Sequence, residues 1–287
     1  MSAKVEEWTV LSMLEWATDF FKKKDIPDPR HSIEWLLAET LDIKRLDLYL
    51  KYDRPLSSDE LDTLRPMVKR RAQHEPLQYI VGFTDFMNAR ISVDENVLIP
   101  RLETEQLVEI ILDEHPSEDS LSLLDIGTGS GCIPIAIKME RPQWSVHGID
   151  ISEQALEVAR TNAEQNETDL AFRHGDILSP ESFSVKSPLD IIVSNPPYVK
   201  PDEEELLEPQ VKEYEPSEAL FFEDLEKMYG SIIRYAQKNL SQKGTLYLEL
   251  HEQYSSEILD LFDRNNWSAQ LQKDYDKKPR FIIAKRS

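Results

Sequence analysis

A short apolar run that ends in a glycine-rich turn constrains the fold of this chain more than any other feature. Residues 121–126 predict a buried strand, residues 127–131 read Gly-Thr-Gly-Ser-Gly, and residues 133–139 suit a helix. Glycines permit positive φ angles and let a backbone come close to a ligand. The segment therefore predicts a strand, a ligand-binding turn and a helix in succession, which is typical of doubly wound α/β folds.

Strand and helix patterns alternate along the rest of the chain from residue 99 onward. Strands are expected at 145–149, 170–173, 190–193 and 245–250, and helices at 152–165 and 225–240. This alternation favours a mostly parallel sheet that is covered by helices on both faces. Residues 267–273 and 280–285 predict two last strands, and the short turn between them forces antiparallel pairing. We therefore expect a Rossmann-like α/β sheet that ends in an antiparallel hairpin.

The first 75 residues differ, because they predict helices alone. Apolar residues recur at helical spacing from Val10 to Phe21, and Pro27 and Pro29 are expected to break that helix before a second one begins. A capping-box pattern at residues 57–60 opens a third helix that runs to about residue 72. Residues 76–98 change character again and predict a β-hairpin that joins two domains.

Composition narrows the function classes. The 287 residues carry a net charge of −21, whereas proteins that bind nucleic acid tightly present a basic face. The acidic total favours a neutral or basic protein partner over DNA or RNA, although it can also serve solubility alone. No apolar run of about 18 residues predicts a membrane span, and residues 1–7 lack the apolar core of a signal peptide. The single cysteine, Cys132, and the six histidines show no metal-ligand spacing. We expect a cytoplasmic monomer without a metal.

The spacing of the glycine turn excludes two common nucleotide-binding loops. A dinucleotide fingerprint requires a glycine where Cys132 stands, and no Lys-Ser or Lys-Thr pair follows as in a phosphate-binding loop. The remaining interpretation is a loop for the methionine part of S-adenosylmethionine, with Asp125 near the ammonium group. If the glycines are considered alone, a tight strand-to-helix turn with a purely structural role remains an alternative.

Acidic residues after the next two strands extend this interpretation. Asp150 ends the second strand, where a carboxylate can accept both hydroxyls of a ribose. Asp176 and Ile177 follow the third strand, where the adenine is expected. Asp176 can accept from the adenine amino group, and Ile177 can pack on the ring.

The tetrapeptide Asn195-Pro196-Pro197-Tyr198 follows the fourth strand, and there it faces the methyl donor. An amide-type nitrogen is a poor nucleophile, because its lone pair is delocalised. Acceptance of its two N–H bonds by Asn195 Oδ1 and the Pro196 carbonyl aims the nitrogen at the methyl group, while Tyr198 stacks on the flat amide. Positioning and electrostatics then supply most of the rate. The alternative is a proline-rich turn with a structural asparagine cap.

Together with Leu98-Ile99-Pro100-Arg101-Leu102-Glu103-Thr104-Glu105, these motifs resemble the HemK/PrmC family of protein-glutamine methyltransferases over essentially the whole chain. The resemblance implies N5 methylation of the glutamine in the Gly-Gly-Gln motif of peptide chain release factors 1 and 2, with S-adenosylhomocysteine as the second product. It also implies a helical substrate-docking domain at 1–75, a β-hairpin linker at 76–98 and a class I methyltransferase domain at 99–287.

The resemblance also implies which residues form the sites. The cofactor-binding residues are Gly127, Thr128, Gly129, Ser130, Gly131, Asp150, Ile177 and Asn195, and Asn195 to Tyr198 bind the glutamine. Arg101 borders the active site, where it either orients an acidic group or pairs with Glu103. The sequence departs from the family at Leu102, a usual proline, and at His251, a usual glycine. It also lacks the glycines expected at 221–224 and an Ala-Gly pair at 274–280.

Three other functions remain open. Related enzymes methylate a glutamine of a large-subunit ribosomal protein with the same chemistry. Nucleic-acid methyltransferases use similar loops for exocyclic amines, but they require a base-flipping pocket and a phosphate-binding surface. A binding module that kept the fold without catalysis is the third.

Overall fold

The computed structural model describes residues 8–116, 120–186, 188–263 and 267–286. The chain forms two compact units and passes between them at Gly82, Leu207 and Tyr214. One unit comprises Met1–Gly82 with Glu208–Tyr214, and the other comprises Phe83–Leu207 with Glu215–Ser287. Residues 1–7, on which the expectation about a signal peptide rests, lie outside the described residues.

The first unit is helical, as its apolar spacing predicts. Its elements are α1 (Val10–Lys22), α2 (Pro29–Leu41), the 3₁₀ turn η1 (Arg45–Leu50), α3 (Ser58–Arg71), α4 (Leu77–Val81) and α8 (Pro209–Lys212). Ser57 and Glu60 form the expected capping box at the start of α3. Helix α1 ends at Lys22, ahead of both prolines, and Pro29 is the first residue of α2. A proline is favourable there, since the first helical N–H has no partner within the helix.

A buried arginine holds the second segment of this unit, Glu208–Tyr214, against the helices. The guanidinium of Arg71 donates from Nε to Ser32 Oγ at 3.1 Å and from Nη1 to Gln210 Oε1 at 3.1 Å. Tyr214 adds a bond from its hydroxyl to the Gln73 carbonyl at 2.7 Å. The seven residues of Glu208–Tyr214 are therefore fixed to the helical unit.

The second unit begins with the hairpin of β1 (Phe83–Phe86) and β2 (Ala89–Ser92). Asn162 fixes β2, because its Oδ1 accepts from Ser92 N at 2.8 Å and its Nδ2 donates to Ser92 O at 3.0 Å. The hairpin therefore packs within the second unit, whereas α4 ahead of it belongs to the first.

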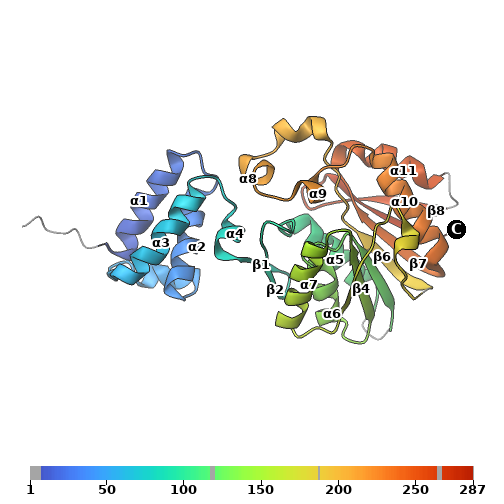
Figure 1. The fold of residues 1–287 in the computed structure, drawn as a ribbon, viewed down its shortest axis with the longest axis horizontal. Coiled ribbons are helices and arrows are strands. Elements are labelled where there is room, and N and C mark those ends of the chain that lie inside the picture. The colour runs from blue at the N-terminus through green and yellow to red at the C-terminus, as the bar shows by residue number, and fades with distance from the viewer. Residues whose placement is uncertain (1–7, 117–119, 187, 264–266, 287) are drawn as a thin grey trace, which may run out of the picture. The chain divides into compact units, whose positions relative to one another are not determined.

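The main sheet has the order β5-β4-β3-β6-β7-β9-β8 (Figure 1). The strands are β3 (Ser122–Ile126), β4 (Ser145–Asp150), β5 (Ala171–His174), β6 (Leu189–Ser194), β7 (Leu240–Glu249), β8 (Trp267–Lys273) and β9 (Pro279–Arg286). The first five pair in parallel, and β9 inserts antiparallel between β7 and β8. The predicted Rossmann-like sheet with a terminal antiparallel hairpin is confirmed.

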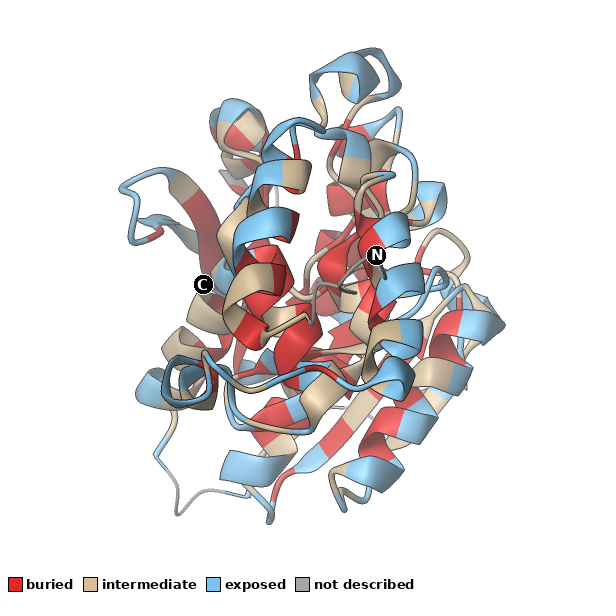
Figure 2. Ribbon diagram, turned by 90° about the vertical axis from the view of Figure 1, so that its left-hand side faces the viewer, coloured by how far each residue is buried: buried red, intermediate tan, exposed pale blue. Residues whose placement is uncertain are grey.

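Helices cover both faces of the sheet, as expected. The longer ones are α5 (Leu102–Glu114), α6 (Cys132–Glu140), α7 (Glu153–Gln165), α10 (Leu225–Asn239) and α11 (Ser255–Asp263). Short turns complete the unit at η2 (Pro180–Ser182), η3 (Pro201–Leu206), α9 (Ser217–Leu220) and η4 (Glu252–Tyr254). Helix α6 packs between α5 and α7, while α10 packs against α11. Figure 2 shows helices that carry both buried and exposed residues. On α7 the buried residues recur at helical spacing, whereas residues 132–137 of α6 are all buried.

The strand order places the functional loops together. The chain runs outward from β3 through β4 to β5, and then returns to pair β6 on the other side of β3. Ile126 and Ser194, the last residues of β3 and β6, are direct neighbours in the register. Ligands in such sheets bind beyond the carboxyl ends at this reversal. The loops that begin at Gly127 and Asn195 therefore lie side by side.

Candidate active site

The glycine turn adopts the backbone that its sequence predicts. Gly127, Gly129 and Gly131 have φ angles of +73°, +53° and +79°, which side chains other than glycine's rarely tolerate. A Cβ on Gly131 would lie 3.1 Å from Ala159 and Phe172, so helix packing explains that glycine. A Cβ on Gly127 or Gly129 would meet nothing within 4 Å. Open space beside these two glycines is what a ligand-binding cradle requires.

Asp125 lies directly before this turn and has no exposed surface. Within the part of the chain that the structure describes, no donor meets either of its carboxylate oxygens in hydrogen-bond geometry. Burial raises the pKa of Asp125 to about 7, and the nearby Thr128 hydroxyl offsets only part of that effect. An unpaired carboxylate in a protein interior is costly, so this position fits a cationic group of a ligand.

Asp150 joins the end of β4 to the glycine turn. Its Oδ2 accepts from Gly129 N at 2.8 Å, and its Oδ1 accepts from Ser152 N at 2.9 Å. Burial raises the pKa of this carboxyl. A carboxylate oxygen has more than one lone pair, so each oxygen can still accept from a ribose hydroxyl.

Asp176 and Ile177 follow β5 at the same edge. Asp176 Oδ1 accepts from Leu178 N at 2.8 Å, which closes a turn of the kind that aspartate side chains favour. Ile177 is buried and packs in the same core as Ile149 of β4. The structure thus gives Asp176 a local turn role, and its contact with adenine stays a prediction.

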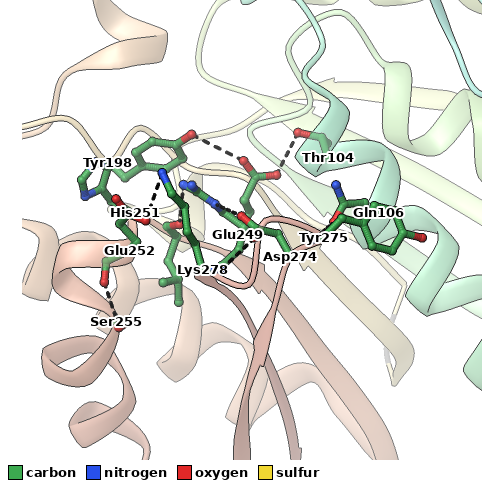
Figure 3. A network of polar contacts seen from close by, with 12 residues as sticks. Thr104, Gln106, Tyr198, Glu249, His251, Glu252, Ser255, Asp274, Tyr275 and Lys278 are labelled. Atoms are coloured by element: carbon green, nitrogen blue, oxygen red, sulfur yellow. Dashed lines mark hydrogen bonds and ion pairs between the residues drawn. The ribbon is translucent and has the colours of Figure 1, made fainter.

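The tetrapeptide loop contacts two residues that were not among the predicted site residues. Asn195 Nδ2 donates to Thr104 Oγ1 at 3.1 Å, and Thr104 Oγ1 donates to Glu249 Oε2 at 2.8 Å. The Tyr198 hydroxyl approaches the other carboxylate oxygen, Glu249 Oε1, at 3.5 Å (Figure 3). Glu249 ends β7, and the rule that assigned Asp150 to the site from its position at a strand end also applies to this residue.

Glu249 is fully buried, and burial raises its pKa to about 7. The Thr104 bond and the charge of Arg280 lower it, while the charge of Glu103 raises it. Arg280 itself donates to Asp274 Oδ2 and to the Leu250 carbonyl, both at 3.3 Å. Among the described residues, the hydroxyl groups of Thr104 and Tyr198 are the hydrogen-bond donors to this carboxylate.

The rest of the tetrapeptide is held from the opposite side. Pro196 is buried, and Val199 pairs with the segment at Phe221 through bonds to Leu220 O and from Phe222 N, both at 3.0 Å. The Tyr198 ring lies 5.9 Å from the His251 ring. His251 therefore packs beside the proposed stacking residue, at a position where the family resemblance predicts a glycine.

Arg101 forms an ion pair with a buried residue far away in the sequence. Its Nη2 donates to Glu215 Oε1 at 2.5 Å, while Glu215 Oε2 accepts from Ile99 N at 3.2 Å. Burial raises the pKa of Glu215, and Arg101 lowers it. The expectation that Arg101 orients an acidic group is consistent with this geometry, and Glu215 was not among the partners considered.

Two further features concern metal ions and membrane spans. The part of the chain that the structure describes holds no group of three or more His, Cys, Asp or Glu side chains arranged to bind a metal ion. Within residues 8–116, 120–186, 188–263 and 267–286, no helix combines the length and the apolarity that crossing a membrane requires.

Comparison with known proteins decides the family. Residues 12–82 match the PrmC N-terminal domain, and residues 103–211 match the methyltransferase small domain. A release factor glutamine methyltransferase of Chlorobaculum tepidum is 38% identical over 281 residues, which cover 95% of this chain and 96% of the relative. This chain belongs to the release factor glutamine methyltransferase family. Members from Leptospira interrogans and Lactococcus lactis are 36% and 40% identical and cover 97% and 83% of the chain, and 98% and 86% of their own lengths.

Solved structures agree on the fold of the methyltransferase unit. A Thermus thermophilus 16S rRNA N2 G1207 methyltransferase, solved with AdoMet and guanosine, has a TM-score of 0.52 at 15% identity and covers 71% of this chain and 50% of its own. A Pyrococcus furiosus methyltransferase has a TM-score of 0.50 at 17% identity and covers 69% and 88%. Membership of the release factor glutamine methyltransferase family confirms the predicted enzyme class, a methyltransferase.

Proposed function

We propose that this enzyme transfers the methyl group of S-adenosylmethionine to the side-chain amide nitrogen of the glutamine in the Gly-Gly-Gln motif of release factors 1 and 2. One structural relationship carries the proposal. Asp125 of β3 and Val193 of β6 are register partners, so the unpaired carboxylate lies two residues from Asn195 on neighbouring strands. A cation site and an amide-recognition site thereby meet at one sheet edge.

The residues at this edge fit the methyl donor. Asp125 binds the ammonium group, because its two buried oxygens lack other donors. The turn from Gly127 to Gly131, with Thr128 and Ser130, surrounds the methionine part, since its backbone leaves open space at two glycines. Asp150 accepts from the ribose hydroxyls, and Asp176 with Ile177 meets the adenine. S-adenosylmethionine, when bound, supplies a methyl group on a positively charged sulfur that is a good leaving group.

The tetrapeptide loop positions the acceptor. Asn195 presents its Nδ2 to Thr104, so its Oδ1 is directed toward the substrate amide. Oδ1 and the Pro196 carbonyl accept the two N–H bonds, and Pro197 stiffens the loop because it lacks a backbone donor. Tyr198 packs on the flat amide and excludes water. The amide nitrogen gains the methyl group and then gives up one proton to solvent.

The preference for a release factor as substrate is supported by relatives that match 95% or more of the chain and are named release factor glutamine methyltransferases. The net charge of −21 fits a basic protein partner better than a phosphate backbone. We assign the docking of that partner to the N-terminal segment 1–75, and a contact near the site to Arg101, which Glu215 orients. Action in the cytoplasm as a monomer, without a metal, belongs to the same proposal.

Transfer of labelled methyl groups to each candidate substrate tests which one the enzyme modifies. Purified enzyme receives S-adenosylmethionine with a radioactive methyl group and, separately, release factor 1, release factor 2, large-subunit ribosomal proteins and total RNA. We expect label in the release factors, and none after the Gly-Gly-Gln glutamine is replaced by alanine. Label in RNA alone would support the exocyclic-amine alternative, and label in a ribosomal protein alone would support the sister activity.

A further inference from the structure

We infer that Glu249 is a positioning residue that fixes both ends of the tetrapeptide Asn195-Pro196-Pro197-Tyr198, acting on Asn195 through the Thr104 hydroxyl and on Tyr198 directly. The inference rests on the proposed function, because it concerns how the same loop holds its acceptor. Figure 3 shows the Tyr198 and Thr104 side chains reaching the two oxygens of this one carboxylate.

The direction of the Asn195 amide follows from counting protons along this chain of bonds. An ionised carboxylate only accepts hydrogen bonds, and a threonine hydroxyl has a single proton to donate. Thr104 donates that proton to Glu249 Oε2, so its oxygen can only accept from Asn195. Asn195 must then present its NH₂ group to Thr104, which directs Oδ1 away from it. Glu249 thus selects the amide orientation in which Oδ1 is an acceptor for the substrate.

The backbone of Glu249 is held by two further elements. The Tyr229 hydroxyl of α10 donates to the Glu249 carbonyl at 3.0 Å, and Glu249 is the register partner of Phe281 on β9. Thr104 is buried on α5, next to a helix face that includes buried Leu107. The relay of hydrogen bonds joins a helix through Thr104, a strand end through Glu249 and a loop through Asn195. These three elements cannot shift independently.

The unfavourable free energy of burying the Glu249 carboxylate argues for a functional role. A carboxylate without exposed surface and with hydroxyl donors alone is unfavourable, because it loses hydration without a bound cation in return. Strongly perturbed carboxyl groups in a protein interior cluster at functional sites, and this one lies two hydrogen bonds from Asn195.

Substitutions that differ by single atoms test the relay. Thr104→Val removes the hydroxyl at nearly constant shape, Thr104→Ser restores it, and Glu249→Gln replaces the carboxylate with a group that also donates. Thr161→Val is the matched control, because its hydroxyl bonds only the Glu157 carbonyl of its own helix in this structure. Each variant is measured for kcat and KM with a Gly-Gly-Gln peptide, for methyl-donor affinity by calorimetry, and for thermal unfolding.

We expect Thr104→Val and Glu249→Gln each to lower kcat about ten- to hundredfold, as small misplacements of catalytic groups do. Donor affinity should stay near wild type, Thr104→Ser should recover most of the rate, and Thr161→Val should match wild type. The double variant Thr104→Val/Glu249→Gln should be no slower than Glu249→Gln alone, since the loss of the carboxylate already removes the link through Thr104.

Two results would overturn the inference: wild-type kcat in folded Thr104→Val, or losses that multiply in the double variant. If Glu249→Gln fails to fold, the comparison of Thr104→Val with Thr104→Ser still decides. Wild-type enzyme that methylates another acceptor would refute the proposed function alone, because the same variants can be tested on that acceptor.

Discussion

Gly129 N donates to Asp150 Oδ2 at 2.8 Å, so the glycine turn and the end of β4 form one rigid unit. This bond places the carboxylate assigned to the ribose beside the backbone assigned to the methionine part. The turn therefore couples two halves of the proposed donor site, and its glycines can be tested separately from the rest of the fold.

Gly129→Ala should weaken donor binding by more than tenfold. The backbone at Gly129 has φ +53°, and a Cβ there enters open space that the donor would fill. Strain alone costs about 1 kcal/mol of stability. Gly82→Ala is the control, because Gly82 also has a positive φ and an open Cβ position. Calorimetry should show unchanged donor affinity for Gly82→Ala despite a similar loss in thermal stability, and equal weakening in both variants would contradict the assignment.

Asp125→Asn should make the ligand-free enzyme more stable at pH 8 while it weakens donor binding. The pKa of Asp125 is about 7 in the folded protein and near 4 in an unfolded chain. The folded state therefore binds an additional proton between these values, so stability falls as pH rises from about 4 to about 7. Above pH 7 wild type bears the full cost of the buried charge, and the variant does not.

Thermal unfolding of both proteins at pH 4.5 and pH 8 checks this prediction. The stability gain of Asp125→Asn should be larger at pH 8, by a few kcal/mol at most. A gain that is equal at both pH values would show that Asp125 does not titrate in this range. Calorimetry with the donor at pH 8 supplies the second half, and undiminished affinity would remove Asp125 from the ammonium site.

With saturating donor, kcat should fall as pH drops below about 7, and Glu249→Gln should abolish that dependence. Burial raises the pKa of Glu249 to about 7, so the relay loses its ionised acceptor under acidic conditions. The charged and titratable groups around it are Arg280, Glu103, Tyr198 and, through their own pKa shifts, Tyr229 and Cys132. A wild-type kcat that is flat from pH 6 to pH 8 would contradict the relay's protonation state.

Arg101→Met should destabilise the enzyme by about 3 kcal/mol, because it leaves the buried carboxylate of Glu215 without its cation. Adding Glu215→Gln should recover part of that loss, as urea unfolding can measure. KM for the release factor separates the roles of Arg101. If Arg101 also contacts the substrate, KM stays high in the double variant after stability returns, whereas a wild-type KM would leave it a structural role.

Most of the fold was predictable because the central strands, such as β3 and β6, are apolar runs bounded by turns. Helices α5 and α11 were not predicted. Helix α5 begins at Leu102, and its N-cap residue, Arg101, makes no side-chain cap hydrogen bond, so the usual start signal is absent. Helix α11 spans only nine residues, Ser255–Asp263, and gives too little periodicity.

The residues of the candidate site also divide into those that the sequence predicted and those that it did not. Asp125, Asp150 and Asn195 stand at predicted strand ends, so their positions followed from the topology. Thr104 did not, because it lies on a helix that was missed. Glu249 also stands at a strand end, but its contact with Thr104 joins residues 145 apart in the sequence. Hydrogen-bond partners at such separation depend on tertiary packing that a single sequence does not display.

The central claim is that Asn195 holds a protein glutamine for methylation at its side-chain nitrogen. Tandem mass spectrometry of a release factor incubated with enzyme and S-adenosylmethionine tests it most directly, with Asn195→Ala as the comparison. The account predicts one added methyl group, located on the amide nitrogen of the Gly-Gly-Gln glutamine, and its loss with Asn195→Ala. A methyl group on any other atom, or full methylation by the Asn195→Ala variant, would contradict it.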